Sequence, residues 1–570
     1  MFDLLIHGGD VVDGTGKPRK RADVGIVGDR IVAIGDLSGA EAAERLDASG
    51  LVVSPGFIDV HTHLDAQAFW DPTLSPSPLH GVTTAVAGNC GFSIAPLGKN
   101  PEDGKYLMKM LSRVEGIPLA TLEEGVPWNW DTTSEYFALL DNSLSINTAF
   151  KVGHSAVRRV VMGEDATKRE ATEDEIAMMC GLVRSALEAG AIGFSSSWST
   201  THNDTEQNMV PSRYASREEL LALCAVLADY PGTSLEFIPQ VGMFTEESIE
   251  LMSEMSRVAR APLNWNVLLV GANNREEVEQ KLAASDHAEM NGGKVRALTV
   301  PMALTFRLCF ASGFLLDAIP GWEEAMLLPI EEKIALFRDP AERARLGAAA
   351  EAADYLRAVA NWSKMMIHFT VHPDNAKYVG RNIGEIAAER NQSPWDALVD
   401  IALLDGLQTA FGHPGSEEPD AAWRARVDVW RDPRAVIGAS DAGAHLDLFL
   451  SCNYTTVLLG EAVVKRKLLP VEEAVHYLTA VPADLYGLRD RGRIEEGAYA
   501  DIVVFDESSV ASKKITFRTD LPAGATRLYA EAVGIQSVVC NGKEIVSNGE
   551  FTANRPGTIL RQGVHTKATL

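Results

Sequence analysis

VVSPGFIDVHTHLD, residues 52–65, is an apolar strand pattern that runs directly into His61 and His63. Residues two apart on a strand point to the same side, so both imidazoles can face one interior. Two converging neutral imidazoles supply half of the tetrahedral ligand set that zinc and similar ions prefer. The alternative is two polar residues on a surface loop. The apolar strand before the pair and the strand–helix alternation after it favour a metal site.

A second stretch, AVIGASDAGAH at 435–445, carries an apolar run into Asp441. An aspartate at the end of a late barrel strand lies on the face that carries catalytic residues. It can ligate a metal and also accept a proton from the attacking water. The alternative is a helix N-cap, for which aspartate is common. Its pairing with His61 and His63 favours the catalytic role.

The middle of the chain, 52–487, alternates short apolar runs with longer helical patterns. The apolar runs are residues 83–89, 147–153, 191–197, 233–238, 262–269 and 435–440. Helical patterns occur at 173–190 and 217–230. This alternation predicts an α/β fold whose parallel sheet closes into a (β/α)8 TIM-like barrel. Residues 312–360, rich in Ala, Glu and Leu, predict a helical insertion in that barrel.

Two β-rich ends, 1–51 and 488–570, flank the barrel. The N-terminal end has short strand patterns separated by glycine-containing turns. In the C-terminal end, 500–506 and 536–546 are strand patterns, and the second is broken by the hairpin-favouring pair Asn541-Gly542. The sequence therefore predicts one small sheet domain assembled from both termini.

Composition narrows the class of partner. The 570 residues carry a net charge of −26, which repels nucleic acid and anionic membrane surfaces. Six cysteines scattered singly indicate a reducing compartment rather than a disulfide framework. The most apolar region, 297–320, is interrupted by Pro301, Arg307 and Asp317 and is not a membrane span. With no secretory signal visible at the N-terminus, we expect a cytoplasmic protein with no nucleic-acid or membrane partner.

Four motifs extend over both ends and the barrel: PGFIDVHTHLD, GVTTAVAGNCGFSIAPL, IGASDAGAH and GRIEEGAYADIVVFD. Together they resemble the D-aminoacylase (N-acyl-D-amino-acid deacylase) branch of the amidohydrolase superfamily. The match covers essentially the whole chain but is loose between about 230 and 395. The first and last motifs are superfamily-wide, and the segment from Gly88 to Gly91 is specific to the branch. The resemblance implies a (β/α)8 barrel, a β-sandwich from the two termini, bound zinc, and hydrolysis of an amide on a D-configured residue.

The resemblance also implies roles for individual residues. His61, His63 and Asp441 match metal ligands, Asp441 also matches the general base, and Cys90 matches a cysteine that ligates or bridges metal. From the sequence itself, Cys90 ends the expected second strand between glycines, where a thiolate can reach an ion. A lone cysteine is also often a small buried hydrophobe, which is the alternative.

The chain departs from the family at the fifth and sixth strands, where the family supplies one histidine each and a lysine close behind the second. Residues 203–286 contain no histidine, and no lysine accompanies the run at 262–269. The lysine that other members carbamylate at the fourth strand is absent as well. One zinc ion is therefore favoured over two, unless another residue replaces a ligand. Glu236 is the best candidate for that replacement, because a carboxylate inside an apolar strand is costly to bury unless a cation or a hydrogen-bond partner accompanies it.

Substrate-binding residues are expected in the loop at 198–216, which carries His202, Arg213 and Tyr214. The guanidinium of Arg213 suits a substrate carboxylate, or it pairs within the fold. His154 resembles the family's Gly-His-Gly segment and is either a pocket residue or a satisfied core histidine.

Two asparagines, Asn264 and Asn266, either line the same wall or are ordinary polar residues at a strand end. The indole of Trp265 and its apolar neighbours favour a bulky apolar substrate group over a small charged one. The sequence assigns no role to His372 or His413.

The predicted function is hydrolysis of the amide bond of a small N-acyl-D-amino acid or related compound by a metal-activated water. Two alternatives stay open. One is a cyclic amide or lactone hydrolase that uses the same site, and the other is a non-catalytic binding protein on a decayed barrel. The retention of His61, His63, Cys90 and Asp441 together argues against decay. The sequence leaves the choice between monomer and homo-oligomer open.

Overall fold

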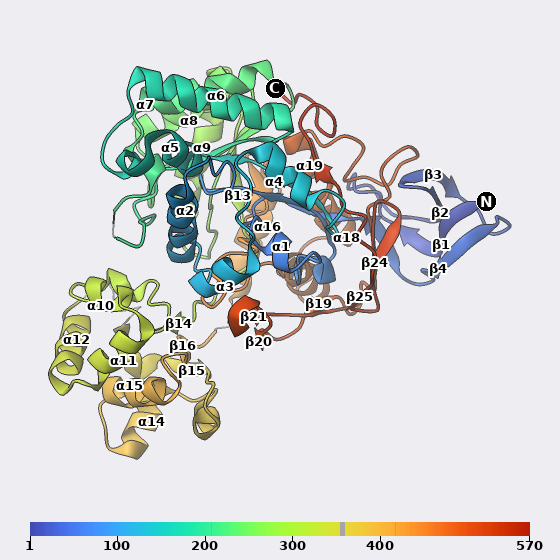
Figure 1. Ribbon diagram of the computed structural model, residues 1–570. Helices are drawn as coiled ribbons and strands as arrows, with labels where there is room; N and C mark the ends of the chain where they lie inside the picture. The colour runs from blue at the N-terminus through green and yellow to red at the C-terminus, as the bar shows by residue number, and fades with distance from the viewer. Residues whose placement is uncertain (207, 354–359, 416–417) are drawn as a thin grey trace.

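The computed structural model describes residues 1–206, 208–353, 360–415 and 418–570. It contains three groups of elements (Figure 1): a central α/β unit, a mainly helical lobe beside it, and a sheet in which the two ends of the chain meet. Within those ranges, no helix combines the length and apolarity needed to cross a membrane.

The central unit is built on parallel strands whose spatial order follows the chain. They are β6 (Phe57–Asp59), β7 (Val82–Ala87), β8 (Asn147–Phe150), β9 (Val152–Gly153), β10 (Gly193–Ser197), β11 (Ser234–Ile238), β12 (Leu263–Trp265), β13 (Val295–Thr299) and β17 (Ala435–Ile437). β8 and β9 are one run of chain interrupted only at Lys151. A parallel bridge between Thr62 and Ala442 joins the segments that follow β6 and β17. The carboxyl ends of these strands therefore lie on one side of the unit.

Each apolar run that predicts a strand contains one, although β12 and β17 end earlier than expected. Helices α6 (Glu173–Ala189) and α7 (Arg217–Val226) confirm the two helical patterns. α6 begins at a capping box between Thr172 and Glu175, and it ends at Gly190 with a φ of +112°. The sequence therefore specifies both limits of this helix through local chemistry.

The helices cover the strands and bury an apolar core between the two. α8 (Glu246–Ala259) and α9 (Arg275–Met290) continue the row that α6 and α7 begin, as Figure 1 shows. Leu223 and Leu251 of this row share one buried cluster with Phe194 and Phe237 of the strands. Burying each such side chain contributes about 1.5–3 kcal/mol, which holds the strand ends in place.

Strands from the two ends of the chain, together with β5, form one nine-stranded sheet. Its strands are β1 (Phe2–Val11), β2 (Lys20–Val27), β3 (Arg30–Gly35), β4 (Ala42–Asp47), β5 (Val52–Pro55), β18 (Ile502–Phe505), β23 (Ile535–Cys540), β24 (Lys543–Ser547) and β25 (Glu550–Phe551). The ends join where β5 pairs antiparallel with β18. Asn541 and Gly542 connect β23 to β24 with φ values of +44° and +77°, the conformation of the predicted hairpin turn.

The mainly helical lobe has a hydrophobic cluster of its own, centred on Trp322, Trp362 and Trp395. Its helices are α10 (Glu323–Leu327), α11 (Ile330–Arg338), α12 (Pro340–Ala352), α14 (Ile383–Arg390) and α15 (Pro394–Leu404). The expected insertion at 312–360 lies inside the lobe, except that residues 354–359 are outside the described ranges. The lobe continues to β16 (Ala410–Gly412), because the segment after 360 packs on the same tryptophans.

Candidate active site

His61 and His63 follow β6 at the carboxyl edge of the parallel strands, and both are buried. Backbone hydrogen bonds to neighbouring segments hold both histidines in place. Thr62 donates its N–H to the carbonyl of Val86 at 2.9 Å, and His63 donates its N–H to that of Ala442 at 2.7 Å. The two imidazole rings lie 5.3 Å apart, centroid to centroid. The strand alternation predicted for this pair therefore places both rings in one interior.

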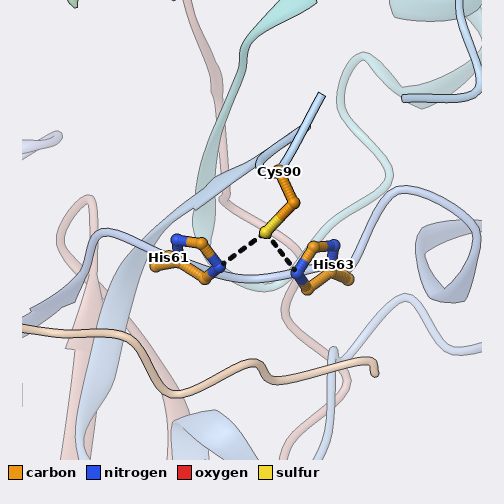
Figure 2. A group of neighbouring side chains, drawn as sticks. All are labelled: His61, His63 and Cys90. Atoms are coloured by element: carbon orange, nitrogen blue, oxygen red, sulfur yellow. Dashed lines mark hydrogen bonds between the residues drawn. The ribbon is translucent and has the colours of Figure 1, made fainter. Parts of the chain in front are cut away.

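Cys90 follows β7 and points its sulfur between the two imidazoles (Figure 2). Its Sγ lies 3.4 Å from Nε2 of His61 and 3.8 Å from Nε2 of His63. These three ligand atoms lie within 4.8 Å of one another. The turn depends on Gly88, whose φ is +75° and where a Cβ would meet the carbonyl oxygen of Lys151 at 2.3 Å.

Asp441 completes the group from the segment after β17. Its Oδ1 lies 3.0 Å from Nε2 of His61 and 3.7 Å from Nε2 of His63. Burial opposes ionisation of this carboxyl, but the two histidines outweigh burial and hold its pKa well below the usual range. Asp441 and Cys90 both have left-handed backbones, with φ of +49° and +57°. Such strain in non-glycine residues clusters at functional sites.

The spacing of His61, His63 and Cys90 fits a zinc ion, and Asp441 lies beside both histidines. Zn–S and Zn–N bonds of about 2.3 and 2.0 Å in a tetrahedron place neighbouring ligand atoms about 3.5 Å apart. The four distances that join Nε2 of His61 or His63 to Sγ of Cys90 or Oδ1 of Asp441 run from 3.0 to 3.8 Å. Burial raises the pKa of the Cys90 thiol well above its usual value, so only a cation at this position would favour the thiolate.

Glu236 lies beside the cluster and is bonded to protein through both oxygens. Its Oε2 accepts the backbone N–H of Cys90 at 2.7 Å, and its Oε1 accepts the side-chain amide of Asn266 at 2.7 Å. Asn264 donates to Asn266 at 3.4 Å and accepts the hydroxyl of Tyr486 at 2.7 Å. The two asparagines therefore belong to the wall of the site and support Glu236.

Lys151 is a buried cation in this wall that the sequence analysis missed. Its Nζ donates to Oδ1 of Asn89 at 2.8 Å and to the hydroxyl of Tyr486 at 3.0 Å. Burial lowers the pKa of Lys151 to about 8, and the negative charge of Glu236 opposes that effect. A lysine inside the apolar run at 147–153 was the available signal, because a buried charge needs a partner.

Glu115 is a second residue that sequence reasoning missed. It is buried, and its Oε1 lies 3.3 Å from Nδ1 of His63. Burial lowers the pKa of His63, but Glu115, Asp441 and Asp65 together outweigh it and raise that pKa to about 9. The surrounding sequence, RVEGIP, carries no signal that separates Glu115 from a surface glutamate.

His154 is wholly buried and does not line an open pocket. Its Nδ1 is hydrogen-bonded to Ser196 at 2.8 Å, and its Nε2 is hydrogen-bonded to Glu219 at 2.8 Å. Glu219 also pairs with the buried guanidinium of Arg158. This arrangement corresponds to the satisfied core histidine, the second of the two interpretations given for His154.

The loop after β10 places its predicted substrate residues differently. His202 packs on Phe92 at 5.0 Å between ring centroids, and its Nδ1 contacts the hydroxyl of Ser197 at 2.9 Å. Burial lowers the pKa of His202 to about 3, with a further contribution from the nearby charge of His63. Arg213 donates to Oδ1 of Asn203 at 2.8 Å, so its guanidinium is held within its own loop. Tyr214 is half-buried.

The sequence predicted that the indole of Trp265 contacts an apolar group of the substrate, and this prediction is wrong. Trp265 is buried and packs edge-on against Phe244 at 4.8 Å, away from the asparagines beside it. Strand alternation explains the difference, because Asn264 and Asn266 face the interior and the residue between them faces the helices. The exposed apolar side chains near this point are Val267 and Leu269.

Two further histidines lie in the helical lobe. Nδ1 of His372 accepts the N–H of Asp374 at the start of a short helical turn, and the carbonyl of His413 accepts a hydrogen bond from His368 at 3.2 Å. These local contacts explain the positions of His372 and His413, and we assign neither a catalytic role.

Comparison with known proteins agrees with this geometry. The profile of the amidohydrolase family matches residues 44–546. The chain belongs to the amidohydrolase family. A D-aminoacylase from Alcaligenes xylosoxydans xylosoxydans is 31% identical over 566 residues, which covers 98% of this chain and 97% of that relative. The chain is thus a metal-dependent amidohydrolase, similar along its whole length to an N-acyl-D-amino-acid deacylase.

Solved structures extend the likeness to the fold. A D-aminoacylase with a binuclear metal centre, activated by one metal and attenuated by a second, matches with a TM-score of 0.66 and 28% identity over 99% of this chain and all of that one. N-acyl-D-glutamate deacylase from Bordetella bronchiseptica, complexed with zinc and a phosphonate inhibitor, matches with a TM-score of 0.67 and 27% identity over 98% and 99%. The cyclic-substrate and non-catalytic alternatives are not favoured.

Proposed function

We propose that this amidohydrolase cleaves the amide bond of N-acyl-D-amino acids. The observation that carries the proposal is the convergence of His61, His63 and Cys90, with Asp441 against both histidines, at the carboxyl edge of the parallel strands. Catalytic residues of α/β barrels lie at this edge. The full-length similarity to deacylases of N-acyl-D-amino acids supports the substrate class.

The chemistry follows from the position of each side chain. His61 and His63 present Nε2, Cys90 presents Sγ and Asp441 presents Oδ1 to one point, where they would hold a zinc ion. When bound, the ion polarises the substrate carbonyl and lowers the pKa of water beside it. Asp441, which is ionised, accepts the proton of the attacking water as its oxygen bonds to the carbonyl carbon. Asp441 then delivers that proton to the nitrogen as the C–N bond breaks.

We propose one ion rather than two. Glu236 and Asn266 stand on the strands that supply histidines in the family, and they hydrogen-bond to each other and to Cys90 instead. Lys151 adds a positive charge to the same wall. A second cation there would have to displace these contacts and would be repelled by the ammonium. The role of Glu236 as a ligand, predicted from the sequence, is thus replaced by a proposal that it positions Cys90.

The proposed architecture has two domains. Residues 52–487 form a (β/α)8 barrel with the helical lobe inserted, and 1–51 with 488–570 form a small β-sandwich domain. The consecutive parallel order of the strands and the bridge between Thr62 and Ala442 support closure of the barrel. β5 pairs with β18, so residues 52–55, at the start of the barrel range, join the sheet of the two ends and support a domain made from both.

A panel of N-acyl-D- and N-acyl-L-amino acids, assayed with the zinc-loaded protein, tests the proposal. We expect release of free amino acid from the D-configured substrates and at least about tenfold less from their L counterparts, a difference of about 1.4 kcal/mol. Activity confined to cyclic amides or lactones would contradict the linear substrate class. Zinc binding without turnover of any panel member would contradict catalysis itself.

A further inference from the structure

The two histidines of the site differ in what their outward nitrogens contact. Nε2 of each ring faces Cys90 and Asp441. Nδ1 of His63 faces the carboxylate of Glu115 at 3.3 Å. Nδ1 of His61 is buried and has no hydrogen-bond partner among the residues that the structure describes. Only one of the two imidazoles therefore has a carboxylate behind it.

We propose that Glu115 is a positioning residue that holds His63 in the tautomer and orientation needed to bind the metal. An imidazole that donates Nδ1–H to a carboxylate keeps the Nε2 lone pair free for an ion, and the negative charge makes that nitrogen more basic. The inference rests on the proposed function, because it assigns Glu115 to the same metal site. Glu115 acts through His63 and contacts neither substrate nor metal.

The chain holds Glu115 firmly enough for this role. It follows α2 (Pro101–Val114), and its own N–H donates to the carbonyl of Leu111. Its carbonyl accepts the N–H of His445, four residues beyond Asp441. On the other side, Arg113 forms an ion pair with Asp317 of the helical lobe. The same short segment therefore connects His63, the loop of Asp441 and the lobe.

The geometry also separates Glu115 from the other carboxylate near His63. Oδ2 of Asp65 accepts the N–H of Gly88 at 3.1 Å, and the carbonyl of Asp65 accepts the hydroxyl of Tyr136. Asp65 is thus engaged in holding the turn before Cys90. Among the described residues, Glu115 is the carboxylate paired with Nδ1 of His63.

Zinc affinity measured by chelator competition tests the proposal with Glu115→Ala and Glu115→Gln, and with Glu124→Gln as control. Glu124 is an exposed glutamate nine residues away on α3 (Leu119–Gly125). Loss of the carboxylate should weaken zinc binding about 10–100-fold in the alanine variant. The glutamine variant should fall in between, because it keeps an oxygen that can face Nδ1 of His63 but carries no charge. The control should bind zinc as the unsubstituted protein does.

Cobalt substitution supplies a second readout that general destabilisation would not change. The visible absorption of bound Co²⁺ reports ligand geometry, and we expect it to shift in Glu115→Ala and to return toward the original spectrum in Glu115→Gln. If Glu115→Ala does not fold, Glu115→Gln alone tests the proposal. A zinc affinity of Glu115→Gln equal to that of the unsubstituted protein would overturn the proposal. Failure of the unsubstituted protein to bind zinc would instead refute the proposed function.

Discussion

Oε2 of Glu236 accepts the backbone N–H of Cys90 at 2.7 Å, so a carboxylate on β11 holds the residue that follows β7. The other oxygen accepts the amide of Asn266 on the next part of the wall. The polar residues that stand where the family has histidines thus bind one another and the cysteine. The site consequently keeps a cysteine, two histidines and an aspartate that face a single point.

The first prediction concerns metal content. We expect elemental analysis of protein dialysed against metal-free buffer to give about one zinc ion per chain, because the network around Glu236 occupies the second position. Two tightly held ions per chain would contradict the prediction. So would a metal-free protein that retains full turnover.

Asp441 and His61 should respond differently to substitution. Asp441→Asn keeps the shape of the side chain but removes the proton acceptor, so kcat should fall at least about a hundredfold while zinc is retained. His61→Ala removes a ligand and should lose zinc together with activity. Steady-state kinetics and metal analysis on both variants distinguish the two roles. Near-normal turnover in Asp441→Asn would show that another group is the base.

Glu236→Gln tests whether Glu236 positions Cys90 or binds the ion. The amide oxygen can still accept the N–H of Cys90, so we expect zinc content to stay near one ion per chain. Lys151 loses its counter-charge, and the free energy of unfolding should fall by about 1–3 kcal/mol. Glu250→Gln, at an exposed position on α8, is the control. Loss of the ion from Glu236→Gln would restore the ligand role predicted from the sequence.

Substrate preference should follow the apolar side chains after β12. Val267 and Leu269 are 37% and 52% exposed, and no lysine accompanies them. Two methylene groups buried against them contribute about 1.6 kcal/mol, so kcat/KM should favour large apolar N-acyl-D-amino acids by at least about tenfold over N-acetyl-D-glutamate. Leu269→Lys should shift the ratio toward the acidic substrate. A preference of the unsubstituted protein for N-acetyl-D-glutamate or N-acetyl-D-aspartate would be the opposite result.

His80 should make stability depend on pH at a place remote from the metal site. It is wholly buried, hydrogen-bonded to Thr456 at 2.7 Å and to the carbonyl of Ala530 at 3.0 Å, and burial lowers its pKa to about 4. The unfolded chain, with a pKa of about 6.5, binds a proton in a range where the folded protein does not. The contribution of neutral His80 to the free energy of unfolding is therefore fully present above about pH 6.5. It falls by about 3 kcal/mol as the pH drops toward 4.

Unfolding of His80→Gln, compared with the unsubstituted protein between pH 7.5 and about pH 4.5, measures this contribution, and its slope with pH should be shallower. His287→Gln, on the surface helix α9, is the matched control because both substitutions leave metal-linked effects unchanged. Equal slopes for His80→Gln and the unsubstituted protein would contradict the assignment.

Local patterns in the sequence determined the elements and several of their limits. Period-two and helical periodicity predicted the strands and α6, and the turn at Asn541-Gly542 follows from backbone preferences of two neighbouring residues. The pair His61 and His63 was predictable because its two members lie two positions apart directly after an apolar strand. The position of Asp441 at the end of a late strand predicted its role, and the resemblance added Cys90 as a ligand, although no spacing rule connects either residue to that pair. Alternation applied to residues 263–266 would also have turned Trp265 away from the site.

Only the tertiary structure decided which distant side chains meet. Glu115 contacts His63 although 52 residues separate them, and Lys151 and Glu236 come from different strands. Their proximity depends on strand order, on the turn at Gly88 and on the path of the chain after α2. Hydrogen bonds and charge interactions act over a few ångströms, whereas local sequence rules act over a few residues. Contacts between segments far apart in the chain are therefore set by the fold as a whole.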